Sequence, residues 1–225
     1  MPHNVELPNY VIERIMAKRG KLHVFDKFDP TKTALIVIDM QNFFVAEVET
    51  AISICPNINR LADVVRGKGG VVAWVQLTVA DEMDGPSLWP IYHDYFFTPE
   101  KMKAHKDGLT KGSEGHALFS DLVVKDEDII ALKNRFSSFI QGSSDLHDRL
   151  QEKDIENLLV AGTATNFCCE TSARDAMMIG YRTVMVSDAN AARYDEDHLA
   201  GLTTIWQSFG DVRTVDECIN TLLAE

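Results

Sequence analysis

Three residues of the chain, Asp39, Lys133 and Cys168, offer a base, a positive charge and a nucleophile. Asp39 ends the apolar segment 33–39, and Lys133 comes directly after the apolar segment 128–132. Cys168 lies in the predicted helix that follows the apolar segment 155–161. Such runs are typical of parallel strands buried on both faces, and ligands of open α/β sheets bind beyond the carboxyl ends of these strands. The sequence therefore predicts that a carboxylate, an ammonium and a thiol meet at one sheet edge.

Cys168 falls in the first turn of a helix predicted over residues 166–179. The positive end of a helix dipole favours the thiolate, which is the reactive form of cysteine. The preceding turn, residues 162–166, can aim backbone N–H groups at one point and so form an oxyanion hole. The alternative is a buried, inert helix cysteine.

Asp39 can accept the thiol proton and later return it to a leaving amine. Burial would raise the pKa of this carboxyl group, and a nearby cation would lower it. Lys133 can be that cation and can also stabilise the thiolate. Taken singly, Asp39 could be a helix cap and Lys133 a solvated strand-end lysine. The convergence of all three residues on one edge favours a reactive site.

The elements that must position these residues alternate between strands and helices, which predicts a mostly parallel sheet covered on both faces. Pro56 is expected in the first turn of its helix, Ser143 to cap another, and Gly180 to end a third. The predicted strands are residues 33–39, 70–77, 128–132, 155–161, 181–187 and 212–215. The predicted helices are residues 5–19, 56–68, 143–153, 166–179, 195–209 and 216–223.

These elements predict one α/β domain over residues 30–225, preceded by a helical extension over residues 1–29. Residues 78–126 show no strand periodicity and carry a run of aromatic side chains between Trp89 and Phe97. Long irregular segments in compact domains usually form lids or interfaces. We expect this aromatic run to pack over the mouth of a site or against a partner subunit, because soluble monomers seldom expose such patches.

Composition excludes several classes of function. The net charge of −12 repels phosphate backbones, so nucleic acid is not expected as a partner. No apolar run approaches the roughly 18 residues that cross a bilayer, and the first residues lack the apolar core of a signal peptide. These features predict a cytoplasmic location without a nucleic-acid or membrane partner. The four cysteines form no C-x-x-C pair, and neighbouring side chains such as Cys168 and Cys169 diverge too much to share a zinc ion.

Three motifs resemble the isochorismatase-like, or cysteine amidohydrolase, family. They are 34-ALIVIDMQNFF-44, 132-LKNRFSSFIQGSSDL-146 and 160-VAGTATNFCCETSARDAMMIGYRTVMVSDA-189. They occur in the family order, and the similarity runs from residue 30 to residue 220. The resemblance implies a three-layer α/β/α sandwich of Rossmann-like type, with six strands and a catalytic triad of Asp39, Lys133 and Cys168.

The resemblance also implies finer features of the site. A cis peptide is expected at Thr163–Ala164, with the N–H groups of Ala164 and Cys168 forming the oxyanion hole. Cys169 replaces a common valine and should face away and pack. The family also forms oligomers, so a homodimer or homotetramer is expected.

Four residues are expected to bind substrate. Gln76 closes the second predicted strand and can offer both a hydrogen-bond donor and an acceptor to a carbonyl or ureide. Phe44, Arg135 and Phe139 belong to the family-like motifs. No cofactor is expected.

The resemblance implies a small-molecule substrate and limits its chemical class. Nicotinamidases of this family carry an Asp-x-His metal site after the second strand, whereas the D-x-H of this chain, residues 145–147, falls in a predicted helix, so no metal is expected. Cys168 favours amide or ureide cleavage, and residues 71–77 and 133–139 are similar to ureidoacrylate amidohydrolases and to carbamoyl-cleaving members such as N-carbamoylsarcosine amidase. Two alternatives remain: vinyl ether hydrolysis by Asp39 without covalent catalysis, and a catalytically silent binding module.

Overall fold

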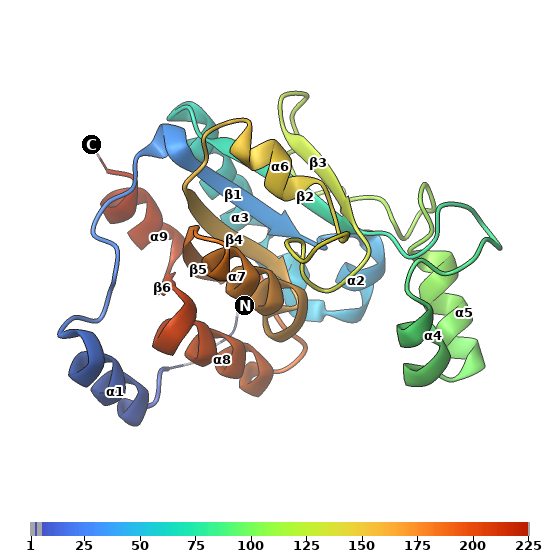
Figure 1. Cartoon of the computed structure of the whole chain (residues 1–225), viewed down its shortest axis with the longest axis horizontal. Coiled ribbons are helices and arrows are strands. Elements are labelled where there is room, and N and C mark those ends of the chain that lie inside the picture. Colours follow the sequence, from blue (N-terminus) through green and yellow to red (C-terminus); the bar gives the residue numbers. More distant parts are fainter. Residues whose placement is uncertain (1–2, 4–5, 225) are drawn as a thin grey trace.

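The structure is a computed structural model that describes residue 3 and residues 6–224. Its sheet has the strand order β3-β2-β1-β4-β5-β6, and all neighbouring strands pair in parallel. The strands are β1 (Thr33–Ile38), β2 (Val71–Leu77), β3 (Ile129–Lys133), β4 (Asn157–Thr163), β5 (Arg182–Ala191) and β6 (Asp211–Arg213). The predicted fold class, a three-layer α/β/α sandwich around a six-stranded sheet, is confirmed (Figure 1).

Helices cover both faces of this sheet. One layer contains α3 and the C-terminal helical turns, and the other contains α6, α7 and α8 (Figure 1). The bounds on the first face are α3 (Glu49–Gly67), α9 (Val215–Glu217) and the π-helical turn η4 (Cys218–Leu222). Those on the second face are α6 (Leu146–Gln151), the π-helical turn η2 (Thr165–Cys169), α7 (Glu170–Met178), α8 (Asp195–Thr204) and the π-helical turn η3 (Ile205–Phe209).

The strand sequences explain why both faces need a cover. Every residue of β1 and of β4 is buried. In β1, Leu35 and Val37 pack into the core on the α3 side, whereas Ala34, Ile36 and Ile38 pack on the α7 side. A strand that is apolar at every position can be stable only between two layers.

Several helix boundaries differ from the prediction. The helix predicted from Pro56 begins at Glu49, and Pro56 lies in its interior. The buried apolar face continues upstream through Ala51 and Ile54, and this packing offsets the backbone hydrogen bond that an interior proline lacks. The helix predicted over 5–19 begins at Asn9; residues 4–5 lie outside the described residues, and Pro8 is the N-cap.

Ser143 was predicted to cap a helix, but the structure shows that it does not. Its hydroxyl donates to the carbonyl oxygen of Ser137 at 2.6 Å, and α6 begins three residues later at Leu146. The hydroxyl of Ser144 instead accepts the N–H of Leu146 at 3.2 Å. The other elements are displaced mainly at their ends: β5 runs on to Ala191, and the helices predicted over 166–179, 195–209 and 216–223 each contain a π-helical turn.

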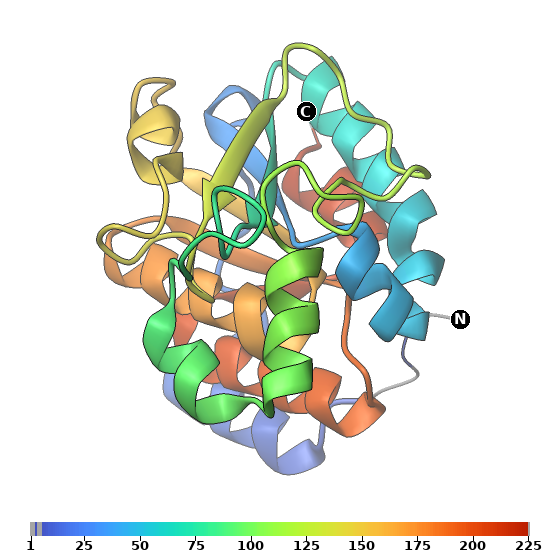
Figure 2. The same cartoon turned by 90° about the vertical axis from the view of Figure 1, so that its right-hand side faces the viewer.

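Residues 78–126 contain two helices that the sequence analysis missed, α4 (Pro90–Phe96) and α5 (Pro99–Gly108). Each has a proline in its first turn, and the Thr98 hydroxyl caps α5, so a local start signal was present. The two helices stand beyond the carboxyl ends of the strands, apart from both layers (Figures 1 and 2). A further short helix, α2 (Asn42–Glu47), and the remaining elements α1 (Asn9–Arg19) and η1 (Pro30–Lys32) complete the described chain.

No helix in the described part of the chain is long and apolar enough to cross a membrane.

Gly162 lies where the end of β4 runs close beside the end of β1. The register between β4 and β5 shifts at this point, and Gly162 has a φ of +117°. A Cβ atom here would lie 2.1 Å from the carbonyl oxygen of Ile38, the residue before Asp39. Only glycine therefore allows the backbone that leads to Asp39 and the one that leads to Cys168 to lie side by side.

We predict that Gly162→Ala lowers the free energy of unfolding by more than about 3 kcal/mol, because strain at positive φ adds to a clash between two backbones. Gly180→Ala is the matched control, since Gly180 has a φ of +111° and no atom within 4 Å of its added Cβ. Urea unfolding followed by circular dichroism measures both. Equal losses in the two variants would contradict the close approach of β4 to β1.

Candidate active site

The three residues singled out by sequence meet at one point. The Lys133 Nζ donates to Asp39 Oδ2 at 2.8 Å and lies 3.3 Å from Cys168 Sγ. A third bond, of 3.0 Å, runs to the carbonyl oxygen of Arg135. Asp39 and Lys133 are each 1% exposed and Cys168 is 5% exposed. The ammonium thus has its donors directed at a carboxylate, a thiol and a carbonyl inside the protein.

The backbone fixes each member of this group. Asp39 follows β1 with a φ of +52°, and its N–H donates to the carbonyl oxygen of Val75 at 2.8 Å. Lys133 is the last residue of β3, and Cys168 lies in the π-helical turn η2 that follows β4. The peptide bond between Thr163 and Ala164 is cis.

Asp39 has one carboxylate oxygen that Lys133 does not occupy. This atom, Oδ1, is buried and has no hydrogen-bond partner in the described part of the chain. A buried acceptor without a partner is costly, and such atoms are often retained for a catalytic role. Oδ1 is therefore available to accept a proton from the adjacent thiol.

The charges of the group determine its resting protonation. Burial raises the pKa of Asp39, and the charge of Lys133 opposes that rise. Burial alone would lower the pKa of Lys133, but the charges of Asp39 and Cys168 outweigh it and raise this pKa. Lys133 is thus an ammonium, whose charge favours the carboxylate form of Asp39.

The prediction that the site favours a thiolate is corrected by the structure. Burial raises the pKa of Cys168, the charge of Asp39 raises it further, and Lys133 only partly opposes them. Cys168 is therefore a neutral thiol, since burial outweighs any effect of the helix end. A neutral thiol can act as a nucleophile only if a base takes its proton, and Asp39 is the adjacent candidate.

A cavity of about 480 Å³ opens onto Asp39 and Cys168. Ala164 also lines it, as does Phe44, one of the predicted substrate contacts. Most of the wall is aromatic: the rings come from Phe43, Phe44, Tyr92, Phe97, Phe136 and Phe167. A small, flat molecule could be enclosed beside the thiol.

Gln76, Arg135 and Phe139 do not line this cavity. Gln76 shares a face of β2 with Trp74, away from Cys168, and donates to the carbonyl oxygen of His116 at 2.7 Å. Its alternation along the strand, rather than its position at the strand end, decides where it points.

Arg135 donates to the carbonyl oxygens of Leu88 and Asn134, and its guanidinium lies 5.3 Å from the ring centre of Trp89. Phe139 packs in the core beneath α7, with its ring centre 5.7 Å from that of Tyr181. Both side chains therefore stabilise the segment after β3. Contrary to the prediction, neither lines the cavity that contains Cys168. Cys169 packs in the same core with 0% exposure.

The aromatic run of α4 is divided between the cavity and the solvent. Tyr92 and Phe97 line the cavity, whereas Ile91, Tyr95 and Phe96 are 64%, 79% and 71% exposed. The expectation of packing over a site mouth therefore describes only the inner residues of this segment.

Several cavity residues were not predicted to bind substrate. Lys101 and His105 come from α5, Asn166 from η2, and Asp197 from α8. The sequence analysis did not place His105 at the site, because the helix that carries it was not predicted. The proline and threonine at the start of α5 are the signal that could have revealed its cavity-facing side.

Among the described residues, no group of three or more His, Cys, Asp or Glu side chains is arranged to hold a metal ion. His147 of the D-x-H motif hydrogen-bonds with the Tyr181 hydroxyl, with 3.0 Å between Nδ1 and oxygen. This contact links α6 to the start of β5, so the histidine of the D-x-H motif has a structural role.

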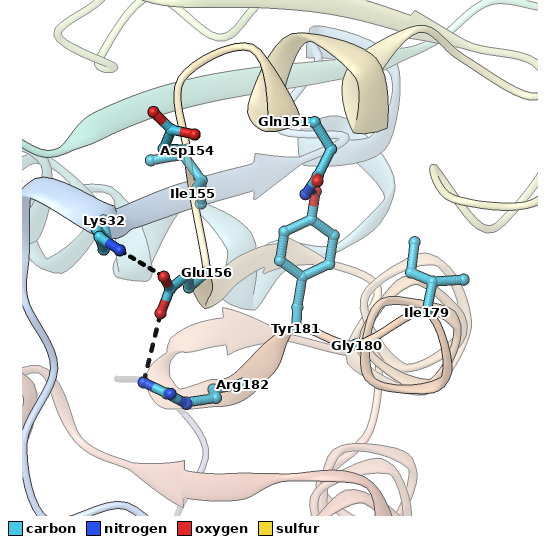
Figure 3. A pocket seen from close by; sticks show the side chains of 9 residues that line it. All are labelled: Lys32, Gln151, Asp154, Ile155, Glu156, Ile179, Gly180, Tyr181 and Arg182. Atoms are coloured by element: carbon cyan, nitrogen blue, oxygen red, sulfur yellow. Dashed lines mark hydrogen bonds and ion pairs between the residues drawn. The ribbon is translucent and has the colours of Figure 1, made fainter.

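A second hollow, of about 440 Å³, lies at the opposite edge of the sheet (Figure 3). Three of its charged groups pair with one another: Glu156 accepts from Lys32 at 2.6 Å and lies 3.8 Å from Arg182, and Asp154 also lines the hollow. The Tyr181 hydroxyl likewise accepts from Gln151. This hollow contains paired surface charges at the amino ends of strands and offers no nucleophile.

Comparison with known proteins places the chain in a family. The family model described as Isochorismatase domain matches residues 33–217. The chain belongs to the isochorismatase family. A cysteine hydrolase from Pseudomonas syringae pv. phaseolicola 1448A has a similar structure, with a TM-score of 0.74 and 28% sequence identity over 88% of this chain and 97% of that one.

Two relatives are similar to the chain in sequence. An uncharacterized isochorismatase family protein from Bacillus subtilis, YwoC, is 27% identical over 84% of this chain and 93% of its own length. A probable inactive nicotinamidase from Arabidopsis thaliana is 33% identical over 76% of this chain and 86% of its own. The N-carbamoylsarcosine amidase from Thermoplasma acidophilum shares the fold, with a TM-score of 0.65 and 23% identity over 83% of this chain and 98% of that one. The chain is an isochorismatase-family hydrolase by these comparisons.

We predict that Lys133→Ala lowers kcat/KM by roughly a hundredfold or more, because Asp39 becomes protonated without its counter-charge and the base is lost. Lys133→Arg should rescue little, since a planar guanidinium cannot replace a compact ammonium among three fixed acceptors. Ammonia release from a hydrolysed amide measures the activity.

Lys32→Ala is the matched control, because Lys32 pairs with Glu156 at the far edge of the sheet. Circular dichroism must show that each variant is folded. Wild-type kinetics in folded Lys133→Ala would show that the ammonium has no part in the reaction.

Proposed function

We propose that the protein is a cysteine hydrolase that cleaves a C–N bond of a small amide, ureido or carbamoyl compound through a thioester on Cys168. The observation that carries this proposal is the position of one buried ammonium, 2.8 Å from Asp39 Oδ2 and 3.3 Å from Cys168 Sγ, beside an enclosed cavity. Asp39 and Lys133 then act on a single nucleophile.

The first half of the reaction forms the thioester. Asp39 takes the Cys168 proton while sulfur attacks the substrate carbonyl carbon, and the N–H groups of Ala164 and Cys168 stabilise the oxyanion. The C–N bond breaks as Asp39 returns the proton to the departing nitrogen. Because burial raises the pKa of Asp39, its protonated form is accessible during this transfer.

The second half consumes water. A water molecule attacks the thioester carbon, and Asp39 accepts its proton. The C–S bond breaks, the acid leaves and the proton returns to sulfur, which restores the thiol. Lys133 remains an ammonium throughout and balances whichever of Asp39 and Cys168 carries the negative charge.

Two other functions fit the family. In vinyl ether hydrolysis, Asp39 would protonate the substrate and Cys168 would not form a bond. In a silent binding module no chemistry would occur, and a relative described as a probable inactive nicotinamidase makes this alternative concrete. The buried thiol beside an acceptor without a partner favours the covalent reaction over both.

We predict that a screen of small amides, ureides and carbamoyl compounds finds ammonia release in wild-type protein, and that Cys168→Ala abolishes it. Cys169→Ala is the matched control, because it removes the neighbouring thiol from the core and not from the cavity. Intact-mass spectrometry should detect an acylated wild-type chain during turnover. Turnover that survives Cys168→Ala would favour Asp39 chemistry, and an absence of turnover with every compound would favour the binding module.

We also propose that the protein is a homo-oligomer, because α4 exposes Ile91, Tyr95 and Phe96 together. Light scattering at micromolar concentration should give a dimer or tetramer, and Tyr95→Lys combined with Phe96→Lys should shift it toward the monomer. The mass of a single chain for the wild-type protein would refute this proposal.

A further inference from the structure

A line of contacts leads from His3 to the turn that carries Cys168. His3 is bound at two points beyond the end of β5: the N–H of Ala192 donates to His3 Nε2 at 2.9 Å, and His3 Nδ1 lies 2.5 Å from Asp195 Oδ1. The imidazole of His3 is 1% exposed. His3 lies outside residues 33–217, the part of the chain that the family model matches. A residue of the N-terminal extension is thus buried against the hydrolase domain.

The two contacts determine which nitrogen of His3 carries a proton. A backbone N–H can only donate, so His3 Nε2 must be the acceptor and carries no proton. The ring proton is therefore on Nδ1, where the carboxylate of Asp195 accepts it. One neutral imidazole thus satisfies the N–H of the buried Ala192 and joins the end of β5 to the first turn of α8.

His3 also packs on His198 of α8. The two ring centres lie 4.2 Å apart and the ring planes differ by 20°, so the imidazoles stack. His198 is 1% exposed, and burial together with the neighbouring His3 lowers the pKa of His198 to about 3. His198 is therefore neutral near pH 7, and the stack brings together two uncharged rings.

His198 in turn contacts the turn that contains the nucleophile. Its Nδ1 lies 2.8 Å from the hydroxyl oxygen of Thr165, the first residue of η2, and both side chains are buried. Thr165 directly follows Ala164 and comes three residues before Cys168. The backbones of α8 and η2 also lie close together, because a Cβ atom added to Gly201 would lie 3.2 Å from the carbonyl oxygen of Thr165. The turn that carries Cys168 therefore packs directly against α8.

The segment that His3 binds, residues 192–197, also forms part of the cavity wall. Two of its side chains, Arg193 and Asp197, line the cavity that contains Cys168. His3 makes two of the contacts that fix the backbone and the first helical turn of this segment. Because a misplacement of about 1 Å can cost a hundredfold in rate, a contact remote from the reacting atoms can control a reaction.

We propose that His3 and His198 are positioning residues of the active site: docked His3 is a latch that orders residues 192–197 and, through His198 and Thr165, the turn that carries Cys168. This inference rests on the proposed function for its chemistry and adds a part of the chain outside the family domain to the site. Neither imidazole lines the cavity, so both act through the residues that they hold.

Hydrogen–deuterium exchange, read by mass spectrometry on the full-length chain, tests the latch without a substrate. His3→Ala should speed amide exchange across residues 164–169 and 192–198 by roughly tenfold or more, because it removes two hydrogen bonds and a stacked ring. His3→Gln, which still offers an acceptor to Ala192, should keep part of the protection.

His23→Ala is the matched control within the N-terminal extension. His23 Nδ1 lies 3.0 Å from Asp211 Oδ1, and its ring stacks on Trp206 with 5.5 Å between centres, but neither residue lines the cavity. His23→Ala should leave exchange across both segments unchanged. The proposal would be overturned if His3→Ala had no effect, if the two variants had equal effects, or if the change were confined to residues 192–198.

Kinetics show whether the latch serves the reaction. With a compound that the wild-type protein hydrolyses, His3→Ala should lower kcat/KM by roughly ten- to a hundredfold and His23→Ala should not. Thr165→Val keeps the shape of the side chain without its hydroxyl and should lower kcat with little change in KM, because Thr165 does not line the cavity. Thr165→Ser keeps the hydroxyl and should retain most of kcat. Wild-type kcat in folded Thr165→Val and His3→Ala would overturn the proposal.

The two readouts separate this proposal from the proposed function. Faster exchange across both segments in His3→Ala, with no turnover of any compound by the wild-type protein, would keep the latch and refute the hydrolase. Turnover by the wild-type protein, with unchanged exchange in His3→Ala, would keep the hydrolase and reject the latch.

Discussion

The buried ammonium of Lys133 is the interaction on which the site depends. An uncompensated charge at 1% exposure would be strongly destabilising, so the fold must surround Lys133 with acceptors. It does so with Asp39, Cys168 and one backbone carbonyl. The same contacts that stabilise the buried lysine bring a carboxylate next to a thiol, so the proposed reaction uses the geometry that also stabilises the fold.

The sheet makes this meeting possible from distant parts of the sequence. Asp39 follows β1, Cys168 follows β4, and Lys133 ends β3, which is separated from β1 by β2. Parallel strands bring their carboxyl ends to one edge, and the long side chain of lysine spans the remaining gap. Gly162 allows the end of β4, which leads to Cys168, to lie close to the end of β1, which leads to Asp39.

The sequence predicted the layers and the meeting of Asp39, Lys133 and Cys168, because continuous apolar strands and strand-end residues are local features. It failed for Gln76, whose strand end faces the other layer, and for Phe139, whose ring enters the core. It also missed α4 and α5, which have start signals but little periodicity. The stacking of His3 on His198 depends on how the N-terminal extension lies against α8, and no spacing in the sequence reveals it.

The central claim is that burial, together with the charge of Asp39, keeps Cys168 in its thiol form, and that Asp39 accepts the thiol proton only during the proposed reaction. Thiolate absorbance near 240 nm, taken as the difference from Cys168→Ala across a pH titration, tests it in wild-type and Asp39→Asn protein. Asp39→Asn removes the charge that raises the Cys168 pKa and leaves Lys133 beside the sulfur, so thiolate should appear at lower pH while activity is lost. A variant that titrates like the wild type, or one that remains active, would contradict the account.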